Sequence, residues 1–433
     1  MMHPSADEPG QLERPRILLV APNISRRMGG EAIKALMILE GLLAMGCDVV
    51  QITHARVRDE MRATNANLNV HYVEDGPVQK LLYRLRLDWA LLWLGAWLLH
   101  RKARQVARDF QPWIVHFTSP ISPNIPYFRF PGVSVVIGPL NGNILHPPTF
   151  ADRETWAKRV GQKILAPVQK ISGLFFRGKR SACLLISGGE RTVDALMLGG
   201  CRREQMVFTL DSGVDPQLVT CPAMTHDGPN FRFVFLGRLV RYKGCDLAIR
   251  ALKSVPQAQL DIIGDGEERR ALEDLARNDG VQDRVRFLGW VPGGAQLFDR
   301  LRSYRAFVFP SLAEANGIVV QEAMMLGLPV IAVNWGGPAE LLDDDTGVLI
   351  EPVDEARVIS ELAVAMARLG ADGEAANQLA VAARDKAERA GFSWPDLLHH
   401  WLTIYDAATL PSASRSFAQA LELLRRAQLN PEK

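Results

Sequence analysis

The stretch FVFPSLAEANGIVVQEAMMLGLPVIAV, residues 307–333, decides the fold. Its apolar start, residues 307–309, predicts a short strand that is closed by a proline. Apolar residues then recur at helical spacing over 318–326, and Gly327 predicts the end of that helix. The apolar run 330–333 predicts a buried parallel strand. The stretch therefore predicts a strand–loop–helix–strand unit of an α/β fold.

Two carboxylates frame this unit. Glu314 lies in the loop before the helix, and Glu322 lies about two turns inside it, among mostly apolar residues. A buried carboxylate is costly unless a donor reaches it, and the helix N-terminus around Asn316, Gly317 and Ile318 offers free N–H groups to an anion. The pattern suits a ligand with both hydroxyls and phosphates, such as a sugar nucleotide. The alternative is that Glu322 faces solvent and Glu314 only caps the helix.

The spacing of Glu, seven residues, Glu, followed by Ala-Met and Gly-Leu-Pro-Val-Ile, resembles the signature of glycosyltransferase family 4, also called group 1. The resemblance implies a retaining, nucleotide-sugar-dependent enzyme with the GT-B fold. That fold has two doubly wound Rossmann-like domains that face each other across a cleft, and a C-terminal helix that crosses back to the first domain. One departure is Ala315-Asn316, where the family often has Gly-Phe or Gly-Gly, and this leaves the donor sugar open.

Length and composition agree with two domains. For 433 residues we expect a disordered leader over 1–14, an acceptor-side Rossmann-like domain over 15–215 and a nucleotide-sugar-binding domain over 231–390. Residues 391–433 should be helices that return to the first domain. The net charge of +2 gives no general attraction to nucleic acid. Five scattered cysteines without a CxxC pair favour a reducing compartment over disulfides or a zinc site.

Candidate residues of the first domain follow its predicted strands. Gly29 and Gly30 stand at the entrance of the first helix, where glycines let the backbone approach a phosphate. The resemblance places them at the cleft, and it gives His116, near a strand end, a catalytic role facing the donor sugar. A polar loop after a later strand would be an acceptor or cleft loop, or only a turn. Its residues are Gly138, Asn141, Gly142 and Asn143.

The second domain opens with a strand followed by Arg238 and then Lys243. Two cations beyond the carboxyl end of a strand suit a diphosphate, and both would stabilise the leaving group electrostatically. The resemblance assigns them that role. It also places two further segments beside the nucleotide and its base. They are Gly264, Asp265 and Gly266, and Trp290 with Val291.

Two segments of the first domain have a composition typical of membrane surfaces. Residues 77–110 hold Trp89, Trp93 and Trp97 among arginines and lysines, and the uncharged run is too short to span a bilayer. Residues 151–180 carry eight basic and two acidic residues among apolar ones. We expect peripheral attachment to an anionic membrane. The alternatives are tryptophans packed inside the domain and a merely solvated basic face.

These features together predict a retaining glycosyltransferase that moves a sugar from a UDP- or GDP-sugar to a glycan acceptor in surface polysaccharide or glycolipid synthesis. We expect that acceptor to be lipid-linked. Glu322 would hold the ribose, and Glu314 the transferred sugar. No cofactor or metal is expected, and no nucleic-acid partner. We expect a cytoplasmic protein, peripheral on the inner face of the membrane. The alternatives are an epimerase or phosphorylase on the same fold, and an inactive membrane-associated nucleotide-sugar-binding protein.

Overall fold

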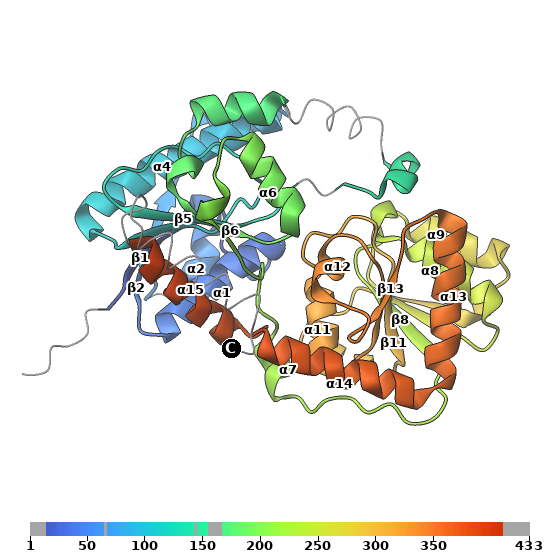
Figure 1. The fold of residues 1–433 in the computed structure, drawn as a ribbon. Helices are drawn as coiled ribbons and strands as arrows, with labels where there is room; N and C mark the ends of the chain where they lie inside the picture. The colour runs from blue at the N-terminus through green and yellow to red at the C-terminus, as the bar shows by residue number, and fades with distance from the viewer. Residues whose placement is uncertain (1–13, 65–66, 143–144, 155–166, 410–433) are drawn as a thin grey trace, which may run out of the picture.

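The computed structural model describes residues 14–64, 67–142, 145–154 and 167–409. They form two α/β domains joined by a connection near residue 215, with the N-terminal domain on the left and the C-terminal domain on the right in Figure 1. Each domain is built on one parallel sheet with helices on both faces. The predicted fold class is confirmed.

The described part of the N-terminal domain holds a seven-stranded parallel sheet of order β3-β2-β1-β4-β5-β6-β7. Its strands are β1 (Arg16–Val20), β2 (Asp48–His54), β3 (Val70–Val73), β4 (Ile114–Phe117), β5 (Ser134–Leu140), β6 (Cys183–Ile186) and β7 (Met206–Phe208). Its helices are α1 (Gly30–Ala44), α2 (Arg58–Thr64), α3 (Pro77–Arg84), α4 (Asp88–Phe110), the helix at 167–175, and α6 (Gly189–Leu198).

The C-terminal domain has a six-stranded parallel sheet, within the residues described, of order β10-β9-β8-β11-β12-β13. Its strands are β8 (Arg232–Leu236), β9 (Gln259–Ile263), β10 (Val285–Gly289), β11 (Ala306–Phe309), β12 (Val330–Val333) and β13 (Val348–Ile350). The helices that accompany it are α7 (Pro216–Thr220), α8 (Cys245–Ala251), α9 (Arg269–Asn278), α10 (Ala295–Leu301), α11 (Ile318–Leu326), α12 (Gly337–Leu341), α13 (Glu355–Ala371) and α14 (Gly373–Arg389).

The unit predicted at 307–333 is present as β11, α11 and β12. β11 and β12 pair in parallel and are fully buried, as a run of apolar residues without alternation requires. Gly317 and Gly327 bracket α11 with φ of 78° and 74°, a left-handed conformation that glycine adopts without strain. The helix therefore begins and ends where the sequence predicts.

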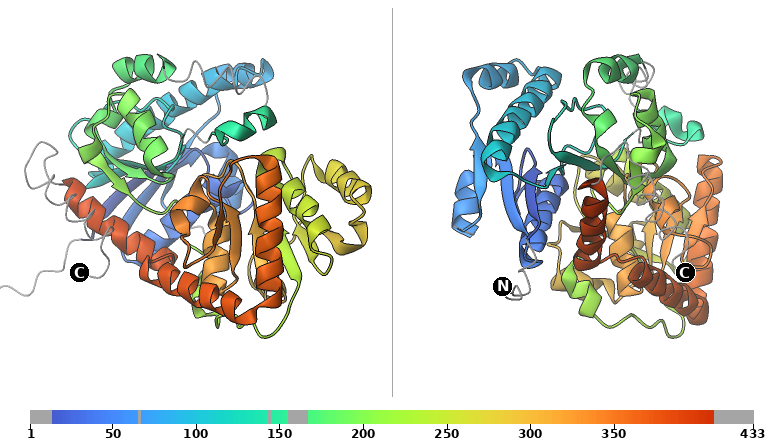
Figure 2. Two further views of the ribbon diagram at one scale, coloured as in Figure 1. Left: turned by 45° about the vertical axis from the view of Figure 1, so that its right-hand side comes forward. Right: turned by 60° about the vertical axis from the view of Figure 1, so that its left-hand side comes forward.

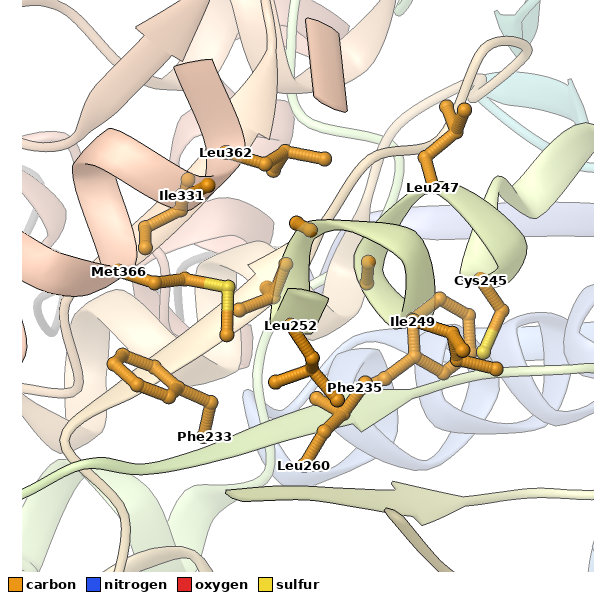
Figure 3. Packing of buried hydrophobic residues seen from close by; sticks show 14 of the residues in the cluster. Phe233, Phe235, Cys245, Leu247, Ile249, Leu252, Leu260, Ile331, Leu362 and Met366 are labelled. Atoms are coloured by element: carbon orange, nitrogen blue, oxygen red, sulfur yellow. The ribbon is translucent and has the colours of Figure 1, made fainter. Parts of the chain in front are cut away.

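One hydrophobic cluster holds the C-terminal domain together. Figure 3 shows Phe233 and Phe235 of β8 packed against Leu252, Ile331 and Met366, all of them buried. This core packs α8 and α13 against the sheet.

The last described helix, α15 (Trp394–Thr409), returns to the N-terminal domain, as Figures 1 and 2 show in red. Its apolar face lies on α1, β4 and β5, with Trp401 fully buried. The backbone N–H of Val214 donates to Phe392 O at 2.8 Å, so the interdomain connection and the start of α15 are tied together. The predicted crossing helix is thus confirmed.

One segment of the N-terminal half docks on the other domain. The short 3₁₀ helix η2 (Pro148–Arg153), teal in Figure 1, lies at the C-terminal domain, where Phe150 belongs to the hydrophobic cluster of Figure 3. Arg153 donates to Asp246 at 3.0 and 2.7 Å and to Glu355 at 2.8 Å. Residues 151–180 were predicted to face a membrane, but Arg153 is buried in a contact between the domains.

Candidate active site

Four loops meet at one edge of the C-terminal sheet. The neighbouring strands β10, β9, β8 and β11 end there, and their loops carry Trp290, the turn 264–266, Arg238 and Glu314 respectively. Backbone hydrogen bonds join the first three loops, including Gly264 N to Gly289 O at 2.8 Å and Leu239 N to Asp265 O at 2.9 Å. Ligands of open parallel sheets bind beyond the carboxyl ends of the strands, so this edge is the candidate site.

The glycines of the turn after β9 have a packing role. Gly264 has φ of 139°, and a Cβ there would lie 1.9 Å from the carbonyl oxygen of Gly237. A Cβ on Gly266 would lie 2.2 Å from the oxygen of Leu239. Only glycine lets the two loops approach this closely. Asp265 lies between the glycines, and its carboxylate accepts from Arg269 at 3.3 Å.

Lys243 and Glu314 form an ion pair at this edge. Lys243 ends the 3₁₀ helix η5 (Arg241–Lys243) after β8, and Glu314 follows β11, so the adjacency of the two strands brings the charges together. Each side chain is only 15% exposed, and the lysine ammonium also lies 5.0 Å from the ring centroid of Phe309. Arg238 is exposed, and no hydrogen bond or ion pair joins its guanidinium to another residue that the structure describes.

The loop that carries Glu314 rests on the turn after β12. Gly337 N donates to Glu314 O at 3.0 Å, and Gly336 has φ of 68°. A Cβ on Gly336 would lie 2.4 Å from that same oxygen, so this Gly-Gly pair leaves room for the loop. The Glu314 carboxylate also accepts from Ala315 N at 3.2 Å. Hydrogen bonds therefore hold both the backbone carbonyl and the carboxylate of Glu314.

Glu322 lies in the second turn of α11 and is partly buried. Burial raises its pKa to about 7, and the nearby charge of Asp215 adds to the effect. Its carboxylate accepts no hydrogen bond from any residue in the described ranges. Asn316 Nδ2, just before the helix, is buried and also lacks a partner. Partial burial without a protein donor makes the Glu322 carboxylate a candidate acceptor for ligand hydroxyls.

The N-terminal domain reaches the site through Arg191 of α6. Its Nη2 donates to the carbonyl oxygens of Glu314 at 3.2 Å and of Ala315 at 3.3 Å. Burial lowers the pKa of Arg191, and the carboxylates of Glu340 and Glu314 oppose that effect. Arg191 is not predicted from the sequence, because no motif distinguishes it from the other basic residues. The one available signal is its position soon after a strand.

The polar loop after β5 lies beside α6. Asn141 is 4% exposed, and neither carboxamide atom has a partner. It packs against Gly188, where a Cβ would lie 2.7 Å from the carboxamide. Gly142 N donates to Thr192 Oγ1 at 3.2 Å. Gly138 was predicted to belong to this loop but lies inside β5, where it has φ of 130° and a Cβ would lie 2.4 Å from Leu185 O. The predicted loop residue Asn143 lies outside the described residues.

His116 lies apart from this group. It is fully buried in β4, its Nε2 is 2.8 Å from Gly138 O, and its Nδ1 is 2.7 Å from the hydroxyl of Tyr405 on α15. Since a carbonyl oxygen only accepts, Nε2 carries the proton and Tyr405 donates to Nδ1. Burial lowers the pKa of His116 to about 4, so the ring is neutral at physiological pH. Both nitrogens are engaged within the protein, an arrangement that does not favour the predicted contact with the donor sugar.

Gly29 and Gly30 are exposed at the start of α1. Neither has positive φ, and a Cβ on either would meet no atom within 4 Å among the residues described. Packing therefore does not require glycine at either position. Their predicted contact with donor phosphates stays a prediction.

The part of the chain that the structure describes contains neither a candidate metal site nor a candidate membrane span. No group of three or more His, Cys, Asp or Glu side chains is placed to hold a metal ion. No helix there is both long and apolar enough to cross a bilayer.

The site can now be compared with known proteins. Residues 223–386 match the family model of "Glycosyl transferases group 1", and this range contains all four loops of the candidate site. The C-terminal domain therefore has the sequence pattern of the group 1 glycosyl transferases over residues 223–386.

Two relatives and one structure show how far the likeness extends. A subunit of the phosphatidylinositol N-acetylglucosaminyltransferase of Arabidopsis thaliana is 26% identical, over 94% of this chain and 85% of that protein. Lipopolysaccharide core biosynthesis glycosyltransferase LpsD of Rhizobium meliloti is 34% identical, but over only 41% of this chain and 49% of that protein. The Anabaena protein HepE, solved in complex with UDP, shares the fold: the TM-score is 0.62 at 17% identity, over 90% of this chain and 100% of that one.

Proposed function

We propose that this chain is a group 1 glycosyltransferase that moves a sugar from a nucleoside diphosphate sugar, with UDP or GDP, to a lipid-linked glycan acceptor, with retention of the anomeric configuration. The observation that carries the proposal is the Lys243–Glu314 ion pair, together with the unpartnered carboxylate of Glu322 in the helix that follows Glu314. One edge of the sheet thus offers cations for a diphosphate and carboxylates for sugar hydroxyls.

Each donor group has a matching protein group at this edge. Arg238 and Lys243 would bind the diphosphate, and the exposed Arg238 needs to give up no partner to do so. Glu322 would accept hydrogen bonds from ribose hydroxyls, which would supply the donors that its carboxylate lacks. Trp290, exposed after β10, would lie near the base. Glu314 would hold hydroxyls of the transferred sugar.

The chemistry then needs positioning and charge stabilisation. The bond from the anomeric carbon to the diphosphate breaks, and the acceptor hydroxyl attacks from the same face, passing its proton to the leaving phosphate. Arg238 and Lys243 would stabilise the charge that develops on the diphosphate, and no metal would be required. Neither glutamate acts as a nucleophile in this proposal.

The acceptor class and the location rest on the relatives and on composition. The names of the two relatives mention phosphatidylinositol and lipopolysaccharide core, which favours a lipid-linked acceptor in glycolipid or surface polysaccharide synthesis. A cytoplasmic protein, peripheral on the inner face of the membrane, would meet both the soluble donor and such an acceptor.

Thermal shift against UDP, GDP, ADP and their sugars, with and without magnesium, tests the donor site. A ligand that binds the native state raises the melting temperature by mass action. We expect a selective, magnesium-independent rise with one diphosphate, which Arg238→Met and Lys243→Met each reduce. Lys253→Met, an exposed lysine of the same domain, is the control and should keep the full shift. No shift with any nucleotide would contradict the proposal.

A second assay separates transfer from the alternatives on the same fold. A transferase releases free nucleoside diphosphate in quantity only when an acceptor is present. Release of the diphosphate without any acceptor would favour a hydrolysing epimerase instead, in which water takes the sugar.

A further inference from the structure

Three helical segments of the N-terminal domain expose large apolar side chains to solvent. Tyr83 of α3 is 72% exposed, Trp89 of α4 is 67% exposed, and Phe175 at the end of the helix 167–175 is 76% exposed. Each helix adds further exposed apolar residues at helical spacing. They are Val78, Leu81 and Leu85 near α3, Leu92, Trp93 and Trp97 on α4, and Val168, Ile171 and Leu174 on the third helix.

The three segments form one continuous surface, which we call the tryptophan face. The rings of Trp93 and Phe176 lie 5.1 Å apart, edge to face, and α3 packs against α4. Phe176 also contacts Phe128 at 5.4 Å, which anchors the third helix to the domain. Figure 1 shows the helix 167–175, in green, beside α4 at the top of the N-terminal domain. Monomeric soluble proteins rarely leave so many large apolar side chains together in water.

Positive charge surrounds this face. Residues 77–110 and 167–177 contain nine Lys and Arg and only two Asp, whereas the whole chain has a net charge of +2. Lys170 and Arg177 are exposed beside Ile171 and Phe175, and Arg101 lies 5.7 Å from the ring centroid of Trp97. Tryptophan next to arginine is typical of the level of lipid headgroups, where the ring is half immersed and the cation meets phosphate.

We propose that the tryptophan face docks the protein on an anionic phospholipid bilayer. The inference deepens the membrane part of the proposed function by naming the surface that makes the contact. The basic residues of the predicted segment 151–180 then differ in whether they can contact the membrane. Lys170 and Arg177 take part, whereas Lys179 does not, because its ammonium is buried on the carbonyl oxygens of Pro123 and Ile125.

The charges favour a bilayer over a second copy of the chain. Two tryptophan faces placed together would bring like charges into contact, which costs free energy at an interface. An anionic membrane instead supplies the opposite charge over a broad area, and it accepts apolar side chains without requiring a matching shape. Among the described residues no helix can cross a bilayer, so the contact would be peripheral.

Flotation of the full-length protein with vesicles tests the proposal. The vesicles are phosphatidylcholine alone or phosphatidylcholine with phosphatidylglycerol, each at low and high salt. We expect binding to the anionic vesicles that weakens with salt. Trp89→Ser with Phe175→Ser should lower the partition coefficient about tenfold or more. Lys170→Glu with Arg177→Glu should weaken the preference for anionic vesicles, because it lowers the charge around this face but leaves it positive.

Two matched controls lie on the C-terminal domain. Val364→Ser with Val381→Ser removes exposed apolar groups, and Arg300→Glu with Arg368→Glu makes the same change of charge. Both should bind vesicles like the wild type. The nucleotide-induced thermal shift should persist in every variant, so failure of this inference is distinguishable from failure of the proposed donor site.

Several outcomes would overturn the proposal. They are no binding to anionic vesicles, equal binding to both vesicle types, and unchanged binding of the Trp89→Ser/Phe175→Ser variant. A dimer in solution that this variant converts to a monomer would assign the face to a second copy instead.

Discussion

At the scale of single residues, the ionised Glu322 should lower the stability of the protein but favour the binding of a nucleotide. Its pKa is raised to about 7 from an ordinary 4.5, so the native state holds a proton that the unfolded chain releases. The resulting loss of stability is absent below pH 4.5, grows as the pH rises from 4.5 to about 7, and is complete above pH 7. A ribose that donates to the carboxylate would offset part of this cost.

Glu322→Gln should therefore stabilise the free protein at alkaline pH and weaken nucleotide binding. We expect it to be more stable than the wild type by about 2 kcal/mol near pH 8, with the difference fading toward pH 4.5. The affinity for the nucleoside diphosphate should fall about tenfold, because a charge-assisted hydrogen bond becomes a neutral one. Urea unfolding across pH, with titration calorimetry, measures both. A glutamine variant less stable than wild type near pH 8 would contradict this account of Glu322.

Glu314 should matter more for turnover than for folding. Glu314→Gln keeps the shape of the side chain but removes the charge that pairs with Lys243, and we expect kcat to fall by about 10²-fold. The affinity for the nucleoside diphosphate should hold, since Lys243 is then free for phosphate. Diphosphate release and thermal unfolding are the measurements, with the exposed Glu374→Gln as control. An unfolded Glu314→Gln protein would refute the assignment.

At the scale of elements, α15 is fastened to the N-terminal sheet by the Tyr405–His116–Gly138 chain of hydrogen bonds. Tyr405→Phe removes only the hydroxyl and leaves His116 Nδ1 buried without a donor, which should cost about 1–3 kcal/mol of stability. We expect kcat at saturating substrate to stay near that of the wild type. Chemical denaturation and initial rates test this, with the exposed Tyr83→Phe as control. A fall in kcat without loss of stability would instead support the catalytic role predicted for His116.

The contrast between α11 and His116 shows how far sequence predicts structure here. The limits of α11 follow from local causes, its apolar period and the glycines at its ends, so the sequence predicts them well. The partners of His116 come from Gly138 and from α15, which lie 22 and 289 positions away along the chain. Similarly, the basic character of 151–180 is visible in the sequence, but the docking of Arg153 on Asp246 and Glu355 depends on the arrangement of two domains.

At the scale of the whole molecule, two arginines bridge the domains in different ways. Arg153 and its neighbour Phe150 attach η2 to the flank of the C-terminal domain, and they contact Asp246, Glu355 and the hydrophobic cluster. Arg191 instead reaches the loop that carries Glu314. The first contact fixes a connection between domains, whereas the second places an N-terminal side chain against the candidate site.

Arg191 should therefore couple the position of the N-terminal domain to turnover. Its guanidinium donates to two carbonyl oxygens, so Arg191→Met leaves the loop of Glu314 without that support and should lower kcat about tenfold. The thermal shift induced by the nucleoside diphosphate should persist, because Arg238, Lys243 and Glu322 all lie on the C-terminal domain. Arg203→Met is the matched control, since Arg203 forms an exposed ion pair with Glu190 on the same domain. If the two variants turn over equally, Arg191 only joins the domains and the loop of Glu314 is held by the Gly336–Gly337 turn alone. If Arg191→Met loses both turnover and the nucleotide shift, the arginine belongs to the donor site itself, and the division of labour between the domains proposed above is wrong.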